Sequence, residues 1–125
     1  MCQLNLHKDI ESGQKTSSYS TDNGMFFLKR EPSAGALDAT FNPVGTPPGT
    51  VRYPTTSITL IGRALAVQTD GSVVIVGSVS TTSNAALVRY TNAGDLDPSF
   101  GSGGLVSTII GTNSAFFGVA IQPDG

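Results

Sequence analysis

The chain has 125 residues, enough for one domain with a real core. Its formal net charge is −2, and its seven Lys and Arg are scattered, which argues against a nucleic-acid partner and against a polybasic membrane patch. Only 13% of the residues are charged while 15 are glycine and seven are proline, a mixture that favours short strands and tight turns over helices. No segment approaches the 18 or so apolar residues of a membrane span, and the first 25 residues lack the apolar core of a signal peptide.

The N-terminal part predicts two strands separated by a polar loop. Cys2–His7 alternates apolar and polar residues, which is the period of a short strand. Residues 9–24 are polar and rich in Ser, Thr and Gly, and we expect a loop there. Phe26–Glu31 predicts the next strand. Residues 42–57 contain four prolines and are expected to form a surface excursion.

The middle of the chain predicts a hairpin with a buried second strand. Ile58–Gln68 is strand-like, with Gly62 as the expected bulge. Asp70-Gly71 is a strong hairpin turn signal. Ser72–Val79 then contains four consecutive aliphatic residues, which indicates burial on both faces of a sheet. Two further strands are predicted over Leu105–Ile110 and Ala115–Gln122.

An internal repeat organises the chain. Ala85–Phe100 repeats Met25–Phe41 at an offset of 59 residues, with an Arg near the end of a strand, a Gly-containing turn and a Leu-Asp-x-x-Phe hook. The matched positions are Leu28, Arg30, Gly35, Leu37, Asp38 and Phe41 in the first copy, and Leu87, Arg89, Gly94, Leu96, Asp97 and Phe100 in the second. Ala66–Gly71 also recurs as Ala120–Gly125, at an offset of 54. We assign the difference of five residues to the Pro-rich excursion. Self-similarity at this period indicates a repeat architecture.

These residues resemble a known family. The pattern A-[IV]-Q-x-D-G, an aliphatic strand, A-L-V-R-Y and G-D-L-D-P-S-F-G-x-G-G is similar to the delta-60 repeat family over about residues 26–125. That family consists of bacterial repeats regarded as β-propeller-like, without an established activity, so the resemblance implies a fold and a cell-surface or extracellular setting but no catalytic residues. The first copy departs from the pattern, because Lys29 and Glu31 stand where the second has Val88 and Tyr90.

The expected fold is therefore all-β, with about two four-stranded antiparallel blade-like repeats in permuted phase, forming an incomplete propeller. The first repeat covers residues 1–61, lacks its first strand and carries the insertion at 42–57. The second covers residues 62–125 and includes a closing or next-blade strand at 115–122. Because a propeller typically has four to eight blades, three arrangements are open: a piece of a longer protein, a ring of several copies, or a small sandwich.

Residues with catalytic or metal-binding chemistry are few. His7 is the only histidine and Cys2 the only cysteine, so neither a zinc site nor a nucleophile–base pair is expected. Asn92, Asp95 and Asp97 do not follow the order of a calcium loop and are better explained as turn formers. The sequence predicts no enzyme, no metal and no cofactor.

Arg30 and Asp38, like Arg89 and Asp97, are eight residues apart. We hypothesise that each arginine fixes its hook by a charge-assisted hydrogen bond; an Arg-lined ligand pocket is the alternative. The residues expected to hold turns and hooks are Arg30, Asp38, Phe41, Asp70, Gly71, Arg89, Asp97 and Phe100. The phenylalanines are expected in the core, namely Phe26, Phe27, Phe41, Phe100, Phe116 and Phe117.

Arg52 and Tyr53 lie in the Pro-rich excursion and are the predicted ligand contacts, because they pair a cation with an aromatic ring on an expected exposed loop. The predicted function is a non-enzymatic repeat module for protein interaction or structural assembly, within a bacterial or phage surface protein. Its expected partners are other copies of itself or the rest of a larger protein. The alternative is an oligomeric, lectin-like propeller that binds carbohydrate in clefts between blades.

Overall fold

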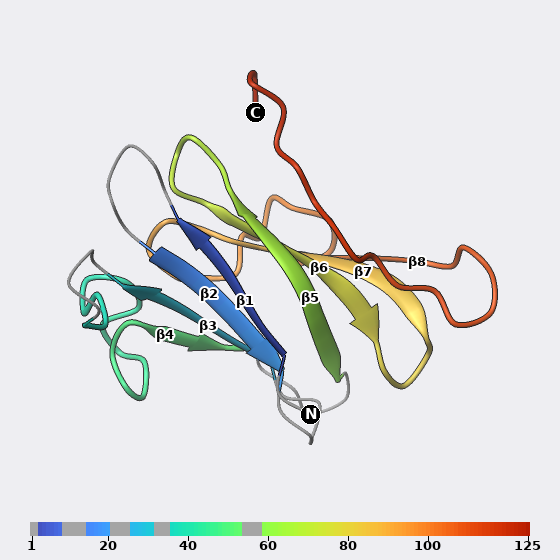
Figure 1. Cartoon of the computed structure of the whole chain (residues 1–125), viewed down its shortest axis with the longest axis horizontal. Coiled ribbons are helices and arrows are strands. Elements are labelled where there is room, and N and C mark those ends of the chain that lie inside the picture. Colours follow the sequence, from blue (N-terminus) through green and yellow to red (C-terminus); the bar gives the residue numbers. More distant parts are fainter. Residues whose placement is uncertain (1–2, 9–14, 21–25, 32–35, 54–58) are drawn as a thin grey trace.

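The computed structural model describes residues 3–8, 15–20, 26–31, 36–53 and 59–125, the first three ranges by their backbone. Every regular element in these residues is a β-strand, so the all-β prediction is confirmed. Eight strands form two four-stranded sheets, each in chain order and with antiparallel neighbours (Figure 1). The described residues contain no helix that is long and apolar enough to cross a membrane.

The first sheet contains a strand in the region predicted as a loop. Its first three strands are β1 (Gln3–Lys8), β2 (Lys15–Ser20) and β3 (Phe26–Glu31). The prediction of a loop over residues 9–24 is wrong where β2 lies. Its sequence, KTSSYS, has no clear apolar alternation, but β2 pairs with a strand on each side. Backbone pairing therefore decides its conformation, against weak local preference.

The fourth strand of this sheet is β4 (Thr50–Arg52). It lies inside the stretch predicted as a surface excursion and pairs with β3, so the first sheet has four strands. Eight positions separate Phe41 from Gly49 but four separate their counterparts Phe100 and Gly104, so the first copy has four additional residues between these two positions.

The second sheet follows the prediction closely. It consists of β5 (Leu60–Val67), β6 (Val73–Val79), β7 (Asn84–Tyr90) and β8 (Leu105–Thr108). The expected bulge is present, because the register shifts between Gly62 and Ala64. The hairpin turn is also present, with the Gly71 N–H donating to the Gln68 carbonyl at 2.9 Å. All seven residues of β6 are buried, which confirms that this strand is covered on both faces.

Both sheets contribute to one core. Phe41 and Tyr90 are fully buried. The cluster comprises Phe41, Val51 and Tyr53 from the first sheet and its hook, and Leu60, Leu65, Val73, Ile75, Val79, Ala86, Val88 and Tyr90 from the second. The two sheets are therefore joined by a shared apolar core.

The C-terminal segment differs from the prediction. Residues 115–122 form no strand, and the segment runs across the second sheet and away from it (Figure 1). The Ser114 N–H donates to the Ser83 carbonyl at 2.7 Å and the Phe116 N–H to the Gly77 carbonyl at 3.0 Å. Because no neighbouring strand in the described residues pairs with the segment, a ladder cannot form. Phe117, predicted in the core, is 71% exposed.

Candidate functional site

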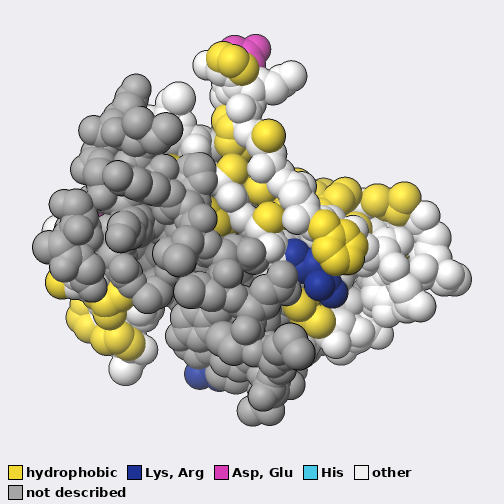
Figure 2. Space-filling model, in the orientation of Figure 1, with side chains coloured by type: hydrophobic (Ala, Val, Ile, Leu, Met, Phe, Trp, Pro, Cys, Tyr) yellow, Lys and Arg dark blue, Asp and Glu magenta, His cyan; other side chains and the backbone are white. Residues whose placement is uncertain are grey.

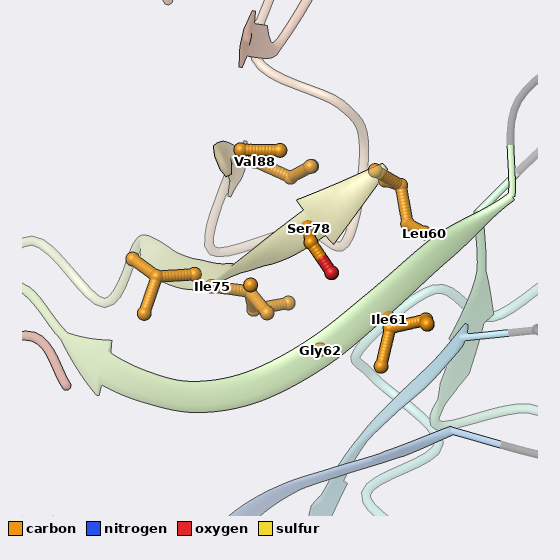
Figure 3. Close-up of a pocket in the computed structure, with 9 residues that line it drawn as sticks. Leu60, Ile61, Gly62, Ile75, Ser78 and Val88 are labelled. Carbon is orange, nitrogen blue, oxygen red and sulfur yellow. The ribbon is translucent and has the colours of Figure 1, made fainter. Parts of the chain in front are cut away.

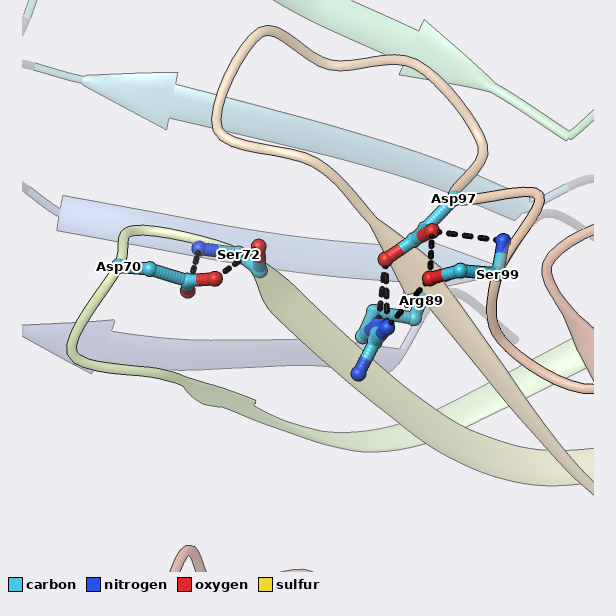
Figure 4. Close-up of polar contacts among 5 residues, drawn as sticks. All are labelled: Asp70, Ser72, Arg89, Asp97 and Ser99. Carbon is cyan, nitrogen blue, oxygen red and sulfur yellow. Dashed lines mark hydrogen bonds and ion pairs between the residues drawn. The ribbon is translucent and has the colours of Figure 1, made fainter. Parts of the chain in front are cut away.

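The hook at Leu96–Phe100 is held by the carboxylate of Asp97. Its Oδ1 accepts hydrogen bonds from the Ser99 N–H at 2.9 Å and from the Ser99 hydroxyl at 2.6 Å (Figure 4). The Phe100 N–H donates to the Asp97 carbonyl at 3.0 Å and closes the turn. A side chain that bonds its own backbone two residues on is the usual way in which Asp stabilises a turn.

Arg89 reaches the hook from the end of β7. Its Nε–H donates to Asp97 Oδ2 at 2.7 Å, and its Nη2 lies 2.7 Å from the same oxygen and 3.1 Å from the Ser99 hydroxyl (Figure 4). The guanidinium also stacks 4.8 Å above the centre of the Phe100 ring. The predicted contact between Arg89 and Asp97 is present. The guanidinium is thus occupied by contacts within its own hook. This geometry favours a role in stabilising the hook over a role in a ligand pocket.

The hook lowers the pKa of Asp97. The largest cause is the hydrogen bond from the Ser99 hydroxyl, followed by the Ser99 N–H, and Arg89 adds to both. Desolvation opposes these effects without overcoming them. The charged form of Asp97 is therefore the form that the folded hook prefers.

The first copy builds the same hook. Asp38 Oδ1 accepts from the Thr40 N–H at 2.9 Å and from the Thr40 hydroxyl at 2.5 Å. The Phe41 N–H donates to the Asp38 carbonyl at 3.0 Å, as Phe100 does in the second hook. The side chain of Arg30 lies outside the described residues, and its pairing with Asp38 stays a prediction.

A third turn uses the same chemistry at the β5–β6 hairpin. Asp70 accepts from the Ser72 N–H at 2.8 Å and from the Ser72 hydroxyl at 3.0 Å (Figure 4). The sequence prediction missed the hydroxyl partners, which are Thr40, Ser72 and Ser99. The signal was available, because D-x-[ST] occurs at each of these turns.

The first hook docks onto a turn of the second sheet. The Asn42 N–H donates to the Ala93 carbonyl at 2.8 Å, and the Asn42 amide donates to the Thr50 carbonyl at 2.6 Å. Gly94 faces this junction at a φ of +92°, and a Cβ there would lie 2.8 Å from that of Asn42. A glycine is thus required both by the turn and by the close approach of the first hook.

Beside this junction lies an open groove of about 220 Å³, which we call the inter-sheet groove. Its lining residues are Asn42, Val51, Arg52, Tyr90, Gly94, Asp95 and Leu96. Both charge signs and an amide border it, so it could take a small polar molecule with hydrogen-bonding groups.

The structure separates the two predicted ligand contacts. Arg52 is exposed and lines the inter-sheet groove, whereas Tyr53 is only 8% exposed and belongs to the core. The prediction of an exposed Tyr53 is wrong because burial alternates through the end of β4 and into the next residue, with Val51 buried, Arg52 exposed and Tyr53 buried. Burial raises the pKa of Tyr53, and it raises that of Tyr90 further, with an added contribution from Tyr53.

A second groove of about 290 Å³ lies between the second sheet and the C-terminal segment, and we call it the C-terminal groove. Its polar lining comes from Arg63, Ser78, Ser80, Ser83, Asn113 and Ser114. The guanidinium of Arg63 stacks 4.6 Å from the centre of the Phe117 ring at its edge. Hydroxyl, amide and guanidinium groups beside an exposed ring could bind a polyhydroxylated ligand.

A third space, at the bulge, is too small for a ligand. It measures about 10 Å³ and lies between β5 and β6, where Leu60, Ile61 and Ile75 line it (Figure 3). This is about the room of one water molecule. The described residues contain no group of three His, Cys, Asp or Glu that could hold a metal ion. Cys2 and the His7 side chain lie outside the described residues.

Comparison with known proteins supports the fold. A family model described as a domain of unknown function (DUF5122) with β-propeller architecture matches residues 68–100. This stretch includes β6, β7, the turn after β7 and the second hook. A β-propeller domain of unknown function is thus suggested. The comparisons with curated proteins and with solved structures gave no match.

Proposed function

We propose that this chain is a non-enzymatic β-propeller-type repeat module of the delta-60 kind, which serves protein interaction or structural assembly in a bacterial or phage surface protein. In this proposal each four-stranded sheet is one blade-like unit. The observation that carries it is the junction between the sheets, where the first hook bonds to the turn after β7 and both sheets fill one core.

The hydrogen bonds and ring contact within the hooks support a structural role for the repeated residues. Arg89, Asp97 and Phe100 contact one another within one hook, and Asp38 repeats the turn in the other. In repeat proteins, recurring motifs of this kind maintain the stacking unit. In this proposal, partners bind to surfaces outside the repeated hook residues, such as the inter-sheet groove.

The test is capture of a protein partner by the immobilised full chain, followed by reconstitution with the purified partner at a defined stoichiometry. In parallel, the chain is assayed for hydrolysis of generic esters and glycosides, with His7→Ala as the control variant. We expect a stoichiometric complex and no turnover. Turnover that is lost in His7→Ala would overturn the proposal.

The C-terminal groove favours carbohydrate binding as a second candidate function. Its volume of about 290 Å³ is near the lower end of ligand-sized pockets, about 300 Å³. Four serines and one asparagine line it, and Phe117 offers an exposed ring at its edge. Binding on a glycan array that is lost in Phe117→Ala and kept in Val44→Ala would support this candidate.

A further inference from the structure

The C-terminal groove carries hydrogen-bonding groups that the fold itself does not use. The hydroxyls of Ser78, Ser80 and Ser83 make no hydrogen bond with the described residues, and neither does the side-chain amide of Asn113. The hydroxyls at the three aspartate turns, in contrast, are each bonded to a carboxylate. A groove lined by unused hydroxyl and amide groups is suited to a ligand that carries several hydroxyls of its own.

Ser78 is the most informative of these residues, because it is buried as well as unbonded. It is only 8% exposed. It lies on β6 beside the core residue Val79, and successive residues of a strand face opposite sides of the sheet. Its neighbour across the hairpin is Ile61, which also lines the groove. Figure 3 shows its hydroxyl pointing away from the core residue Val88. A buried hydroxyl without a partner is unfavourable, so a ligand that bonds it gains affinity.

The charge of the groove is positive. Arg63 is the only charged residue among the described residues that line it. On the face shown in Figure 2, basic side chains (dark blue) lie beside hydrophobic ones (yellow), and the acidic side chains in view (magenta) lie at the outer end of the C-terminal segment. The local charge therefore favours a ligand with a negative group.

The stacking of Arg63 on Phe117 is compatible with binding a carboxylate. The contact of 4.6 Å uses the flat face of the guanidinium, whereas its N–H donors lie at the edges. A carboxylate matches this planar arrangement of donors. Phe117 is 71% exposed, so its ring also offers an apolar surface to a ligand in the groove. The carbon–hydrogen face of a sugar ring is a surface of this kind.

We propose that the C-terminal groove binds a carboxylated saccharide. Arg63 holds the carboxylate, Ser78 and Ser83 bond the ring hydroxyls, and Phe117 packs against the apolar face of the sugar. One guanidinium among several hydroxyls suits a singly charged, hydroxylated ligand better than a phosphate, whose charge is spread over all its oxygens. The inference rests on the carbohydrate-binding candidate and names the chemical class of its ligand.

A pair of ligands that differ in charge tests the proposal on the wild-type protein. Titration calorimetry compares trigalacturonic acid with its uncharged methyl ester. The acid should bind about tenfold more tightly at low salt, because its contact with the guanidinium is charge-assisted, and salt should reduce this preference. Equal affinity for acid and ester would overturn the role of the carboxylate. Acetate that binds as tightly as the acid would overturn recognition of a saccharide, and a lack of binding by both sugars would overturn the proposal as a whole.

Two pairs of variants locate the binding. Arg63→Gln should abolish the preference for the acid, whereas Arg52→Gln, the same change of charge in the inter-sheet groove, should keep it. Ser78→Ala should weaken binding of both the acid and the ester while its urea midpoint stays at or above that of the wild type. Its control is Ser102→Ala, at an exposed serine outside the groove. Equal losses in the two arginine variants, or in the two serine variants, would overturn the site.

Failure of this inference is distinguishable from failure of the proposed function. Equal binding of acid and ester overturns the inference and leaves carbohydrate binding in place. The capture of a protein partner by the immobilised chain uses no saccharide, and its outcome is independent of both titrations.

Discussion

Asp38 and Asp97 occupy equivalent places in two hooks that were built from different flanking sequences. Each accepts a hydrogen bond at 2.9 Å from the N–H two residues on, and each carbonyl accepts one at 3.0 Å from the following phenylalanine. The equivalence extends further, because the Gly49 and Gly104 N–H groups donate to the Phe41 and Phe100 carbonyls at 2.8 Å in both copies. The four-residue insertion between Phe41 and Gly49 is therefore absorbed without altering the hook.

The pKa of Asp97 predicts acid sensitivity of the second hook. Because the folded pKa is lowered below the unfolded value of about 3.9, the contribution to stability is present above that pH and is lost as the pH falls through the folded pKa. We expect Asp97→Asn to lower the urea midpoint at neutral pH and to converge with the wild type in acid.

The control for this prediction is Asp95→Asn, which changes an exposed carboxylate two residues earlier in the same loop. Its urea midpoint should follow that of the wild type at each pH. A wild-type-like profile for Asp97→Asn would contradict the role assigned to the carboxylate.

Two phenylalanines of equal size should differ widely in their contribution to stability. Phe41 is fully buried between the sheets, and Phe41→Ala should cost about 3–5 kcal/mol in the free energy of unfolding. Phe117 is 71% exposed, and Phe117→Ala should stay within about 0.5 kcal/mol of the wild type. Urea unfolding followed by circular dichroism measures both. Similar losses in the two variants would show that the core has been placed wrongly.

The elements that sequence predicts well are those whose local signals agree with their surroundings. The aliphatic run of β6, the Asp70-Gly71 turn and the bulge near Gly62 all carry such signals, and all three are present. The predictions for β2 and for residues 115–122 are wrong for opposite reasons. The polar β2 becomes a strand because two neighbours pair with it, whereas the apolar segment lacks a partner in the described residues.

The residues around the candidate site were partly predictable. The eight-residue spacing of Arg89 and Asp97 indicated their contact, since both lie on one repeating motif. The inter-sheet groove could not be inferred, because Asn42 and Gly94 meet only when two sheets pack, and sequence gives no distance between them. The burial of Tyr53 was missed because the proline content suggested a loop, whereas a three-residue strand forms directly before this residue.

The close contact between β5 and β6 predicts a severe effect of one added methyl group. A Cβ at Gly77 would lie 1.8 Å from the Ile61 carbonyl oxygen, which is backbone and cannot move alone. Gly77→Ala should therefore cost about 1–3 kcal/mol or more in the free energy of unfolding. Gly118→Ala is the matched control, since nothing lies within 4 Å of its Cβ position. A neutral Gly77→Ala would show that the strands are further apart at the bulge.

The hydroxyl of Tyr90 predicts an unusual response to substitution and to alkali. It is buried and has no hydrogen-bond partner among the described residues. Because an unsatisfied buried polar group costs about 1–3 kcal/mol, Tyr90→Phe should leave the free energy of unfolding unchanged or raise it. Tyr90→Ala, which empties the site, should lower it by about 3–5 kcal/mol.

Alkaline titration provides the second measurement on Tyr90. Burial, and then Tyr53, raise its pKa above the ordinary value of about 10. The stability that comes from keeping Tyr90 neutral is thus present below about pH 10 and is lost as the pH rises towards the folded pKa. We expect the ultraviolet phenolate signal of Tyr90, identified by difference from Tyr90→Phe, to emerge together with alkaline unfolding. A phenolate that forms near pH 10 while the circular dichroism of the sheets is intact would place this hydroxyl in contact with water.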